Sequence, residues 1–212
     1  MIIPRAMGMR QVFGILCLGL PLVRAPVAAA QNTNESVEFL VARSGLQDRF
    51  FKESVVLLLP STDLPLVVGM IVNKPSTIRL HTIFPENPAL KDDDARAYFG
   101  GPVDVTSASL VLRQAEASKG ALHLSGDIYV SFDPELISHA YAGAHPASNQ
   151  RLFFGRSQWA PDQLQNEMFR GAWYRLRTRG DCVFSRDPAG VWPAMLKLAR
   201  PTLVVESMGR IP

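Results

Sequence analysis

The sequence has few of the residues that build disulfide-rich or metal-binding domains. Cysteine occurs only twice among 212 residues, at Cys17 and Cys182. The patterns H-x-H, H-E-x-x-H and C-x-x-C are absent, so the usual zinc-ligand spacings are missing. The histidines are isolated, at His81, His123, His139 and His145. We therefore expect no metal site, and a fold that depends on its hydrophobic core.

Long apolar runs and glycine-rich nucleotide loops are also missing. The longest apolar run, residues 12–23, covers about 12 residues, whereas a membrane-spanning helix needs about 20. Strands and helices do not alternate regularly, and no glycine-rich turn joins a strand to a helix. We therefore expect no Rossmann-type dinucleotide site and no cofactor.

The first 30 residues have the order of a secretory signal peptide. They contain no Asp or Glu, and Arg5 and Arg10 precede the apolar run, which is followed by Ala28-Ala29-Ala30. We expect residues 1–30 to be a signal peptide cleaved before Gln31, and residues 31–212 to form one exported domain without a transmembrane segment. An organellar transit peptide is disfavoured, because those are amphipathic and Ser-rich.

Loss of this leader would remove the positive charge of the chain. The formal net charge is +3, and Arg5, Arg10 and Arg24 supply 3 positive charges, which leaves 3 − 3 = 0 for residues 31–212. Nucleic-acid affinity depends largely on neutralised phosphates, so direct nucleic-acid binding is not expected. Cys182 would be the remaining cysteine, so no intramolecular disulfide could form.

The patterns of residues 31–212 predict an α+β fold with a mixed or antiparallel sheet and about three flanking helices. Strands are expected at residues 37–42, 54–59, 66–73, 109–113, 128–132, 151–155 and 174–179, and a further strand at Tyr98-Phe99 is expected to run into Gly100-Gly101-Pro102. Helices are expected at residues 133–143, 161–170 and 187–199, with Pro193 kinking the last one or postponing its start. With 47% hydrophobic and 19% charged residues, the chain can bury one core.

Two loops lie where such a fold would place a site. The central strand Leu66–Asn73 is almost wholly aliphatic and is expected to stop before Pro75, which leaves Asn73 and Lys74 at its end. Gly100-Gly101-Pro102 indicates unusual torsions or a close approach to another segment.

Several short motifs in a fixed order resemble the YqgE/AlgH family of bacterial proteins. The motifs are Phe39-Leu-Val-Ala42, Ser54-Val55-Val56, Gly69-Met-Ile-Val-Asn-Lys-Pro75, Gly100-Gly-Pro-Val103, Gly155-x-Ser-x-Trp159, Gln163-Leu164 with Glu167, Trp173, and Asp187-Pro188 with Trp192. The resemblance implies a compact single domain whose sheet curls into a partial barrel. It implies no established catalytic activity, although some members are labelled transcriptional regulators.

The chain departs from the family pattern at a few positions. Gln158 stands where members usually have glycine, Arg156 where they have an aromatic residue, and Gln165 where an acidic residue is common. A leader is atypical of a family generally regarded as cytosolic. We expect a periplasmic protein, with the cytoplasm as the alternative.

Gly155-Arg156-Ser157-Gln158-Trp159 superficially resembles a hydrolase nucleophile elbow at an expected strand-to-helix turn. The elbow requires glycine where Trp159 stands, and the histidine spacing nominates no base for Ser157. A structural turn packed by Trp159 is the favoured interpretation, and a hydrolase the alternative.

Two sets of residues could bind an anion. Asn73, Lys74, Gly100 and Gly101 would form a small nest if their loops were neighbours, although simple turn and packing roles are favoured. On a strand, the alternating residues Arg175, Arg177 and Arg179 would share one face and present donors suited to phosphate or carboxylate. The alternative for these arginines is a solvated strand edge that its charges protect from aggregation.

Together these patterns predict an exported, non-catalytic binding or accessory protein with no assigned catalytic residue. Its partner could be an anionic small molecule or a protein. The alternatives are a hydrolase that uses Ser157 and a transcriptional regulator. The sequence contains no helix-turn-helix signature for the latter.

Overall fold

The computed structural model describes residues 36–60, 65–91, 94–143 and 149–200, all in one structural unit. The expected leader and His145 lie outside these residues. The described strands are β1 (Val37–Ala42), β2 (Val55–Leu58), β3 (Val67–Ile71), β4 (Pro75–Arg79), β5 (Arg96–Phe99), β6 (Val103–Arg113), β7 (Ala121–Ser125), β8 (Ile128–Ser131), β9 (Gln150–Trp159) and β10 (Trp173–Thr178).

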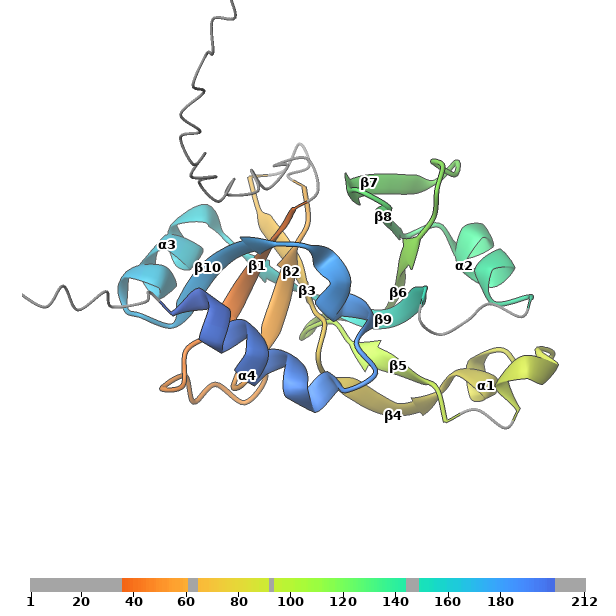
Figure 1. The fold of residues 1–212 in the computed structure, drawn as a ribbon, viewed down its shortest axis with the longest axis horizontal. Coiled ribbons are helices and arrows are strands. Elements are labelled where there is room, and N and C mark those ends of the chain that lie inside the picture. Colours follow the sequence, from red (N-terminus) through yellow and green to blue (C-terminus); the bar gives the residue numbers. More distant parts are fainter. Residues whose placement is uncertain (1–35, 61–64, 92–93, 144–148, 201–212) are drawn as a thin grey trace, which may run out of the picture. The chain divides into compact units, whose positions relative to one another are not determined.

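Four α-helices and two short 3₁₀ segments accompany the described strands (Figure 1). They are α1 (Leu80–Ile83), α2 (Pro134–Ala140), α3 (Pro161–Phe169), α4 (Pro188–Ala199), η2 (Pro88–Leu90) and η3 (Gly180–Phe184). None of these helices has the length and apolarity needed to cross a bilayer.

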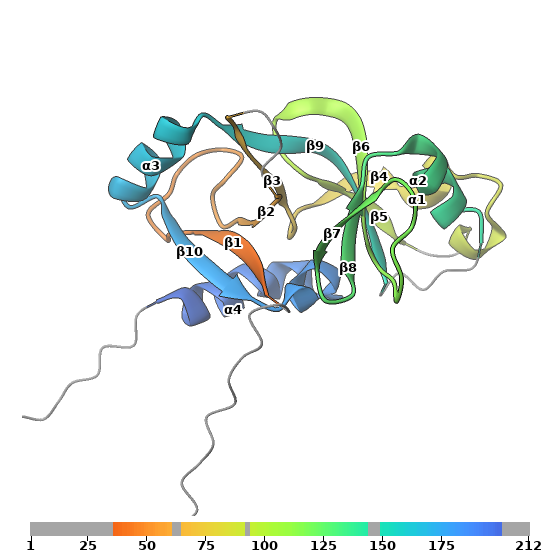
Figure 2. The same cartoon turned by 90° about the horizontal axis from the view of Figure 1, so that it is seen from above.

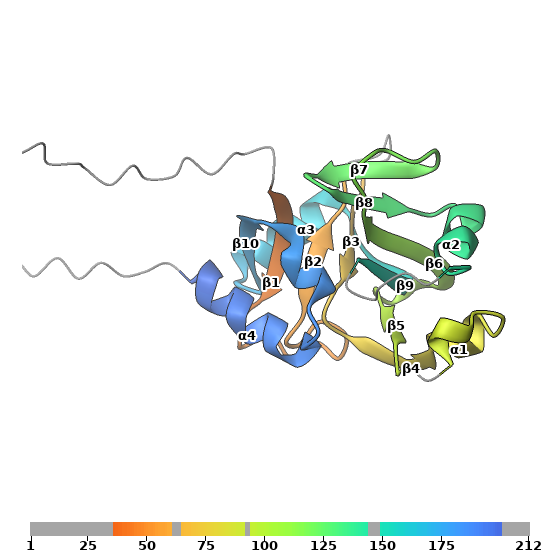
Figure 3. The ribbon, with the colours of Figure 1, turned by 45° about the vertical axis from the view of Figure 1, so that its right-hand side comes forward.

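The strands form one mixed sheet in the order β10-β1-β2-β3-β9-β6-β8-β7. Neighbours along this order are antiparallel, whereas β5 joins β9 in parallel and also pairs with β4. The sheet curls into a half-barrel, with β1, β2, β3 and β10 on one side and β6 to β9 on the other (Figures 2 and 3). The expected α+β class and mixed sheet are confirmed.

The concave face of the sheet holds the main core. Its buried side chains come from both halves, for example Phe39 and Leu57 from the first and Val111 and Phe153 from the second. Helix α4 and the segment η3 contribute to the same core (Figure 3). Burial of apolar surface from both halves therefore holds the curl closed.

Two smaller cores lie outside the curl. One packs α1 and α2 against β6, β8 and β9, and includes Leu80, Ile137 and Leu152. The other packs α3 against β1, β2 and β3, with Trp159 and Trp173 at its centre. Both faces of the central strands are therefore buried, in agreement with their aliphatic sequences.

The expected end of the central strand is wrong. Strand β3 stops at Ile71, and Pro75 begins β4 instead of ending β3. Pro75 lies opposite Tyr98 of β5, and β4 pairs with no other described strand. Proline is tolerated at the first residue of such an edge strand, because its missing N–H is not needed there.

The expected turn after Gly155 is also wrong, because β9 runs unbroken to Trp159. Gly155 has a φ of +73° and bends the strand instead of ending it. Strand β9 pairs with β6 and β5 near its start and with β3 near its end. These successive partners keep the whole segment extended.

Both Asp-Pro pairs begin helices as expected. Asp133 accepts a hydrogen bond from the Glu135 N–H across 2.9 Å, and Asp187 accepts one from the Gly190 N–H across 3.1 Å. Helix α2 ends at Ala140, not next to Gly143. Helix α4 already starts at Pro188, so Pro193 does not postpone it.

Other strand limits differ from the expected ones. Strand β6 begins at Val103 instead of Ser109, whereas β5 ends at Phe99 and runs into the glycine pair as expected. Strands β4 and β7 were not expected, because their segments lack the continuous β-branched pattern of a buried strand.

Candidate functional site

Asn73 joins the end of β3 to the start of β2. Its side-chain oxygen accepts a hydrogen bond from the Val55 N–H across 2.8 Å, and its amide nitrogen donates to the Glu53 carbonyl across 3.0 Å. The side chain is buried, and both of its polar ends are used by the neighbouring backbone. Asn73 therefore has a structural role in shaping the loop before β2.

Lys74 holds the same loop from the other side. Its ammonium group donates to the Phe50 carbonyl across 2.6 Å, while Asp48 accepts from the N–H groups of Phe50 and Phe51. Burial lowers the pKa of Lys74 from its ordinary value, and the carboxylates of Asp48 and Glu53 oppose that shift. The positive charge of Lys74 therefore serves largely to bind the loop before β2.

The glycine pair passes across β9 with backbone against backbone. A Cβ on Gly100 would collide with the Gly155 carbonyl, and one on Gly101 would collide with the backbone of Arg156 and Ser157. The expected close approach is therefore present, and its partner is the Gly155–Ser157 segment. Only glycine fits at this crossing.

The polar groups at the crossing are also in use. The Gly100 N–H donates to the Phe154 carbonyl, and the Gly100 carbonyl accepts from the Ile71 N–H, each across 2.8 Å. The Ser157 hydroxyl donates to the same Gly100 carbonyl across 3.2 Å, and Ser157 is 0% exposed. The anion nest would need the Gly100 amide, which is taken, and Ser157 lies inside the sheet and not on an exposed turn.

Glu167 connects two buried tryptophans. The indole N–H groups of Trp159 and Trp173 both donate to its Oε2 atom, across 3.0 and 2.8 Å. Gln163 donates to the other carboxylate oxygen across 3.0 Å, and the ring of Phe51 packs against both indoles. Residues from β9, α3 and β10 thus meet at one carboxylate, and Phe51 from the loop before β2 packs on the indole rings.

The three alternating arginines Arg175, Arg177 and Arg179 form two groups instead of one row on a strand face. Arg175 and Arg177 lie on the strand, and both form ion pairs with the carboxylate of Glu38 in β1. Arg179 lies one residue beyond β10 and pairs with Asp181 across 3.1 Å. The prediction that all three share one strand face is therefore wrong for Arg179.

Arg179 belongs to a charged network that the sequence did not reveal. Arg113 of β6 pairs with Asp127 across 2.9 Å and also with Asp181. The hydrogen bond from Arg113, aided by Arg179, lowers the pKa of the Asp181 carboxyl, although partial burial opposes it. The network joins η3 to strand β6 and to the turn between β7 and β8, beside a cleft of about 290 Å³. The charges of its two arginines and two aspartates cancel.

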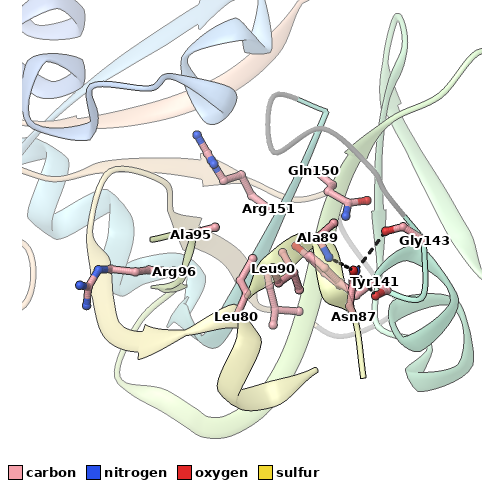
Figure 4. A pocket seen from close by; sticks show the side chains of 11 residues that line it. Leu80, Asn87, Ala89, Leu90, Ala95, Arg96, Tyr141, Gly143, Gln150 and Arg151 are labelled. Carbon is pink, nitrogen blue, oxygen red and sulfur yellow. Dashed lines mark hydrogen bonds between the residues drawn. The ribbon is translucent and has the colours of Figure 1, made fainter. Parts of the chain in front are cut away.

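A small cavity lies between η2, α2 and β9, and Figure 4 shows its lining. Asn87 donates to the carbonyl oxygens of Tyr141 and Gly143, and Gln150 donates to the Ala140 carbonyl. The Tyr141 hydroxyl has no hydrogen-bond partner among the described residues, and burial raises its pKa although Arg151 opposes the shift. The cavity measures about 40 Å³, far below the several hundred Å³ of a metabolite pocket.

Among the described residues, no group of three or more His, Cys, Asp or Glu side chains could hold a metal ion.

The AlgH-like family model matches residues 39–203. The chain belongs to the AlgH-like family. Its relatives include UPF0301 proteins from Cytophaga hutchinsonii, 29% identical with 76% of this chain and 87% of the relative covered, and from Saccharophagus degradans, 26% identical with 80% and 84% covered. This AlgH-like chain is therefore similar to its relatives over most of both lengths.

Two solved structures share the AlgH-like fold. Protein DIP2367 from Corynebacterium diphtheriae superposes with a TM-score of 0.62 at 21% identity, covering 78% of this chain and 87% of that protein. The AlgH protein from Pseudomonas aeruginosa gives 0.59 at 20% identity, covering 82% and 95%. At these identities the likeness concerns the fold alone.

Two of the three departures of this AlgH-like chain from the family pattern, Arg156 and Gln158, lie side by side. The Arg156 guanidinium donates to the Gln158 side chain across 3.4 Å and forms an ion pair with Asp104. The two substitutions thus contact each other on β9, next to the glycine crossing. Both side chains are held on the strand surface by this contact.

Proposed function

We propose that this chain is an exported, non-catalytic binding or accessory protein whose partner carries negative charge. One observation carries the proposal: two surface arginines share a single carboxylate. The side chains of Arg175 and Arg177 are 58% and 72% exposed, and both pair with Glu38. One positive charge is left over, on guanidinium groups suited to carboxylate or phosphate.

The other polar residues of the motifs support a non-catalytic role. Asn73, Ser157 and Glu167 each use their side chains to bind neighbouring segments of the fold. A nucleophilic serine needs an exposed hydroxyl and a base that takes its proton. The Ser157 hydroxyl is instead buried and donates a hydrogen bond to a main-chain carbonyl.

The proposed export depends on the first 30 residues. Their basic start, apolar middle and Ala28-Ala29-Ala30 end favour cleavage before Gln31 and a periplasmic location. The remaining domain has no net charge, which disfavours the alternative of a nucleic-acid-binding regulator.

Native mass spectrometry of the protein from its own host, with an unchanged N-terminus, tests both the proposed export and the binding of an anionic partner. We expect the mass of residues 31–212, together with extra mass from a retained anionic partner that is lost at high salt. A full-length chain with nothing bound would overturn the proposal. Ester hydrolysis that Ser157→Ala abolishes in a folded protein would replace it with the hydrolase alternative.

A further inference from the structure

The free edge of β10 offers main-chain hydrogen bonds to a partner. Strand β10 pairs with β1 over six register positions, from Val37 opposite Thr178 to Ala42 opposite Trp173, and with no other described strand. Every second residue of such a strand turns its N–H and C=O away from its neighbour. Figure 2 shows β10 as the last strand on its side of the sheet.

The two faces of this edge differ in chemistry. Arg175 lies opposite Leu40 and Arg177 opposite Glu38, so both arginines stand on the outer face of the sheet. Tyr174 and Leu176 point to the other face, where they pack with the main core. An extended segment beside β10 would therefore meet positive charge on one face and apolar surface on the other.

The apolar face continues into a groove. A hollow of about 460 Å³ lies between the end of β10, η3 and α4. Its apolar lining comes chiefly from α4, through Val191, Ala194, Met195 and Leu198, and the Leu198 side chain is 64% exposed. The volume is within the range that side chains of a partner or a ligand commonly fill.

Pairing of β10 with a second copy of itself is disfavoured. An antiparallel pair would bring Arg175 and Arg177 of one copy against the same residues of the other. Charged edge strands are a common device against such self-association. A segment that carries carboxylates would instead be attracted.

We propose that β10 binds an extended acidic segment of a partner protein by strand addition. In that segment acidic side chains alternate with apolar ones, so the acids face Arg175 and Arg177 while the apolar residues enter the α4 groove. The main-chain bonds supply affinity, and the two faces supply specificity. This inference rests on the proposed function and specifies its partner.

A labelled synthetic peptide of about eight residues, with glutamate alternating with valine and leucine, tests the inference by fluorescence anisotropy. We expect saturable binding that weakens at least tenfold in Arg175→Gln/Arg177→Gln and in Leu198→Ser. The matched controls Arg79→Gln on β4 and Leu122→Ser on β7 should bind as the unaltered protein does. Thermal unfolding of each variant shows whether it is folded.

Two further peptides separate strand addition from simple charge attraction. A peptide with lysine in place of glutamate, and one with the same composition but contiguous glutamates, should bind at least tenfold more weakly. Equal binding of the contiguous peptide, or self-association of the protein through β10, would overturn the inference.

Hydrogen exchange of the full chain locates the contact. The alternating peptide should slow exchange in residues 173–178, and slowing confined to the β7 edge would overturn the inference. If the alternating peptide fails to bind while native mass spectrometry finds another anion, strand addition fails and the proposed function stands. If neither the alternating peptide nor any other anion binds, both strand addition and the proposed function fail.

Discussion

The hydroxyl of Ser157 donates a hydrogen bond to the main-chain oxygen of Gly100 across 3.2 Å. This bond joins two motifs that lie far apart in the sequence, at the point where the Gly100–Gly101 backbone crosses β9. The role of these motif residues is therefore structural more than catalytic, because their contacts stabilise the crossing of the two backbone segments. Substitutions at these contacts should act on stability, and each contact can be tested separately.

Gly155→Ala should destabilise the protein by about 2–5 kcal/mol. The φ of Gly155 is +73°, which costs a residue with a Cβ about 1–2 kcal/mol, and the new methyl would overlap the Gly101 carbonyl at a further cost of about 1–3 kcal/mol. Urea unfolding measures the change. Gly45→Ala is the control, because a methyl group there would have no atom within 4 Å and the free energy should change by less than about 0.5 kcal/mol. Similar losses of unfolding free energy in Gly155→Ala and Gly45→Ala would contradict the close contact between Gly155 and the Gly101 carbonyl.

Glu167→Ala should lower the free energy of unfolding by about 2–3 kcal/mol, because the indole N–H groups of Trp159 and Trp173 lose their acceptor. Denaturant unfolding followed by tryptophan fluorescence measures the loss. Glu116→Ala, at an exposed bend, should change the free energy by less than about 0.5 kcal/mol. An equally small effect at Glu167 would show that the carboxylate does not join the two tryptophans.

Tyr141→Phe should alter how stability depends on alkaline pH. Burial raises the pKa of Tyr141 above its value in the unfolded chain, which is about 10. The stability from this group is therefore complete below about pH 10 and is lost as the pH rises further. Between about pH 10 and 11.5 the unaltered protein should lose more stability than Tyr141→Phe. Cys182, whose pKa burial raises to about 12, contributes equally to both proteins.

At pH 7, Tyr141→Phe should be as stable as the unaltered protein or up to about 1 kcal/mol more stable, since the removed hydroxyl has no partner among the described residues. Tyr174→Phe is the contrast. The Tyr174 hydroxyl accepts a hydrogen bond from Arg43 across 3.0 Å, so its removal should cost stability. Equal alkaline curves for the unaltered protein and Tyr141→Phe would contradict the assigned burial.

Local signals in the sequence predicted local structure well. Asp133-Pro134 and Asp187-Pro188 begin helices because capping and the fixed φ of proline act within one turn. Gly100 and Gly101 indicated a close approach because only a missing Cβ allows one. The segment approached, at Gly155, could not be inferred, since nothing near the glycine pair specifies a distant partner.

Features that depend on strand neighbours were missed for the same reason. Pro75 indicates a strand end only if the strand is central, and its position at the edge of the sheet decides otherwise. The period of two placed Arg175 and Arg177 on one face, but the pairing of Arg179 with Asp181 depends on where β10 stops. The network of Arg113, Asp127 and Asp181 joins three separate segments that no local pattern connects.

Strand β9 has a consequence for the order in which the protein folds. It is the shared neighbour of β3, β5 and β6, all of which precede it in the chain. Until residues 150–159 are available, the two halves of the sheet have no strand to connect them. Pairings between residues so distant in sequence form slowly, because the entropy cost of closing a long loop arises before the contacts that offset it have formed. A growing chain therefore keeps its halves apart until late, which would suit the passage of an unfolded chain through a membrane that the proposed export requires.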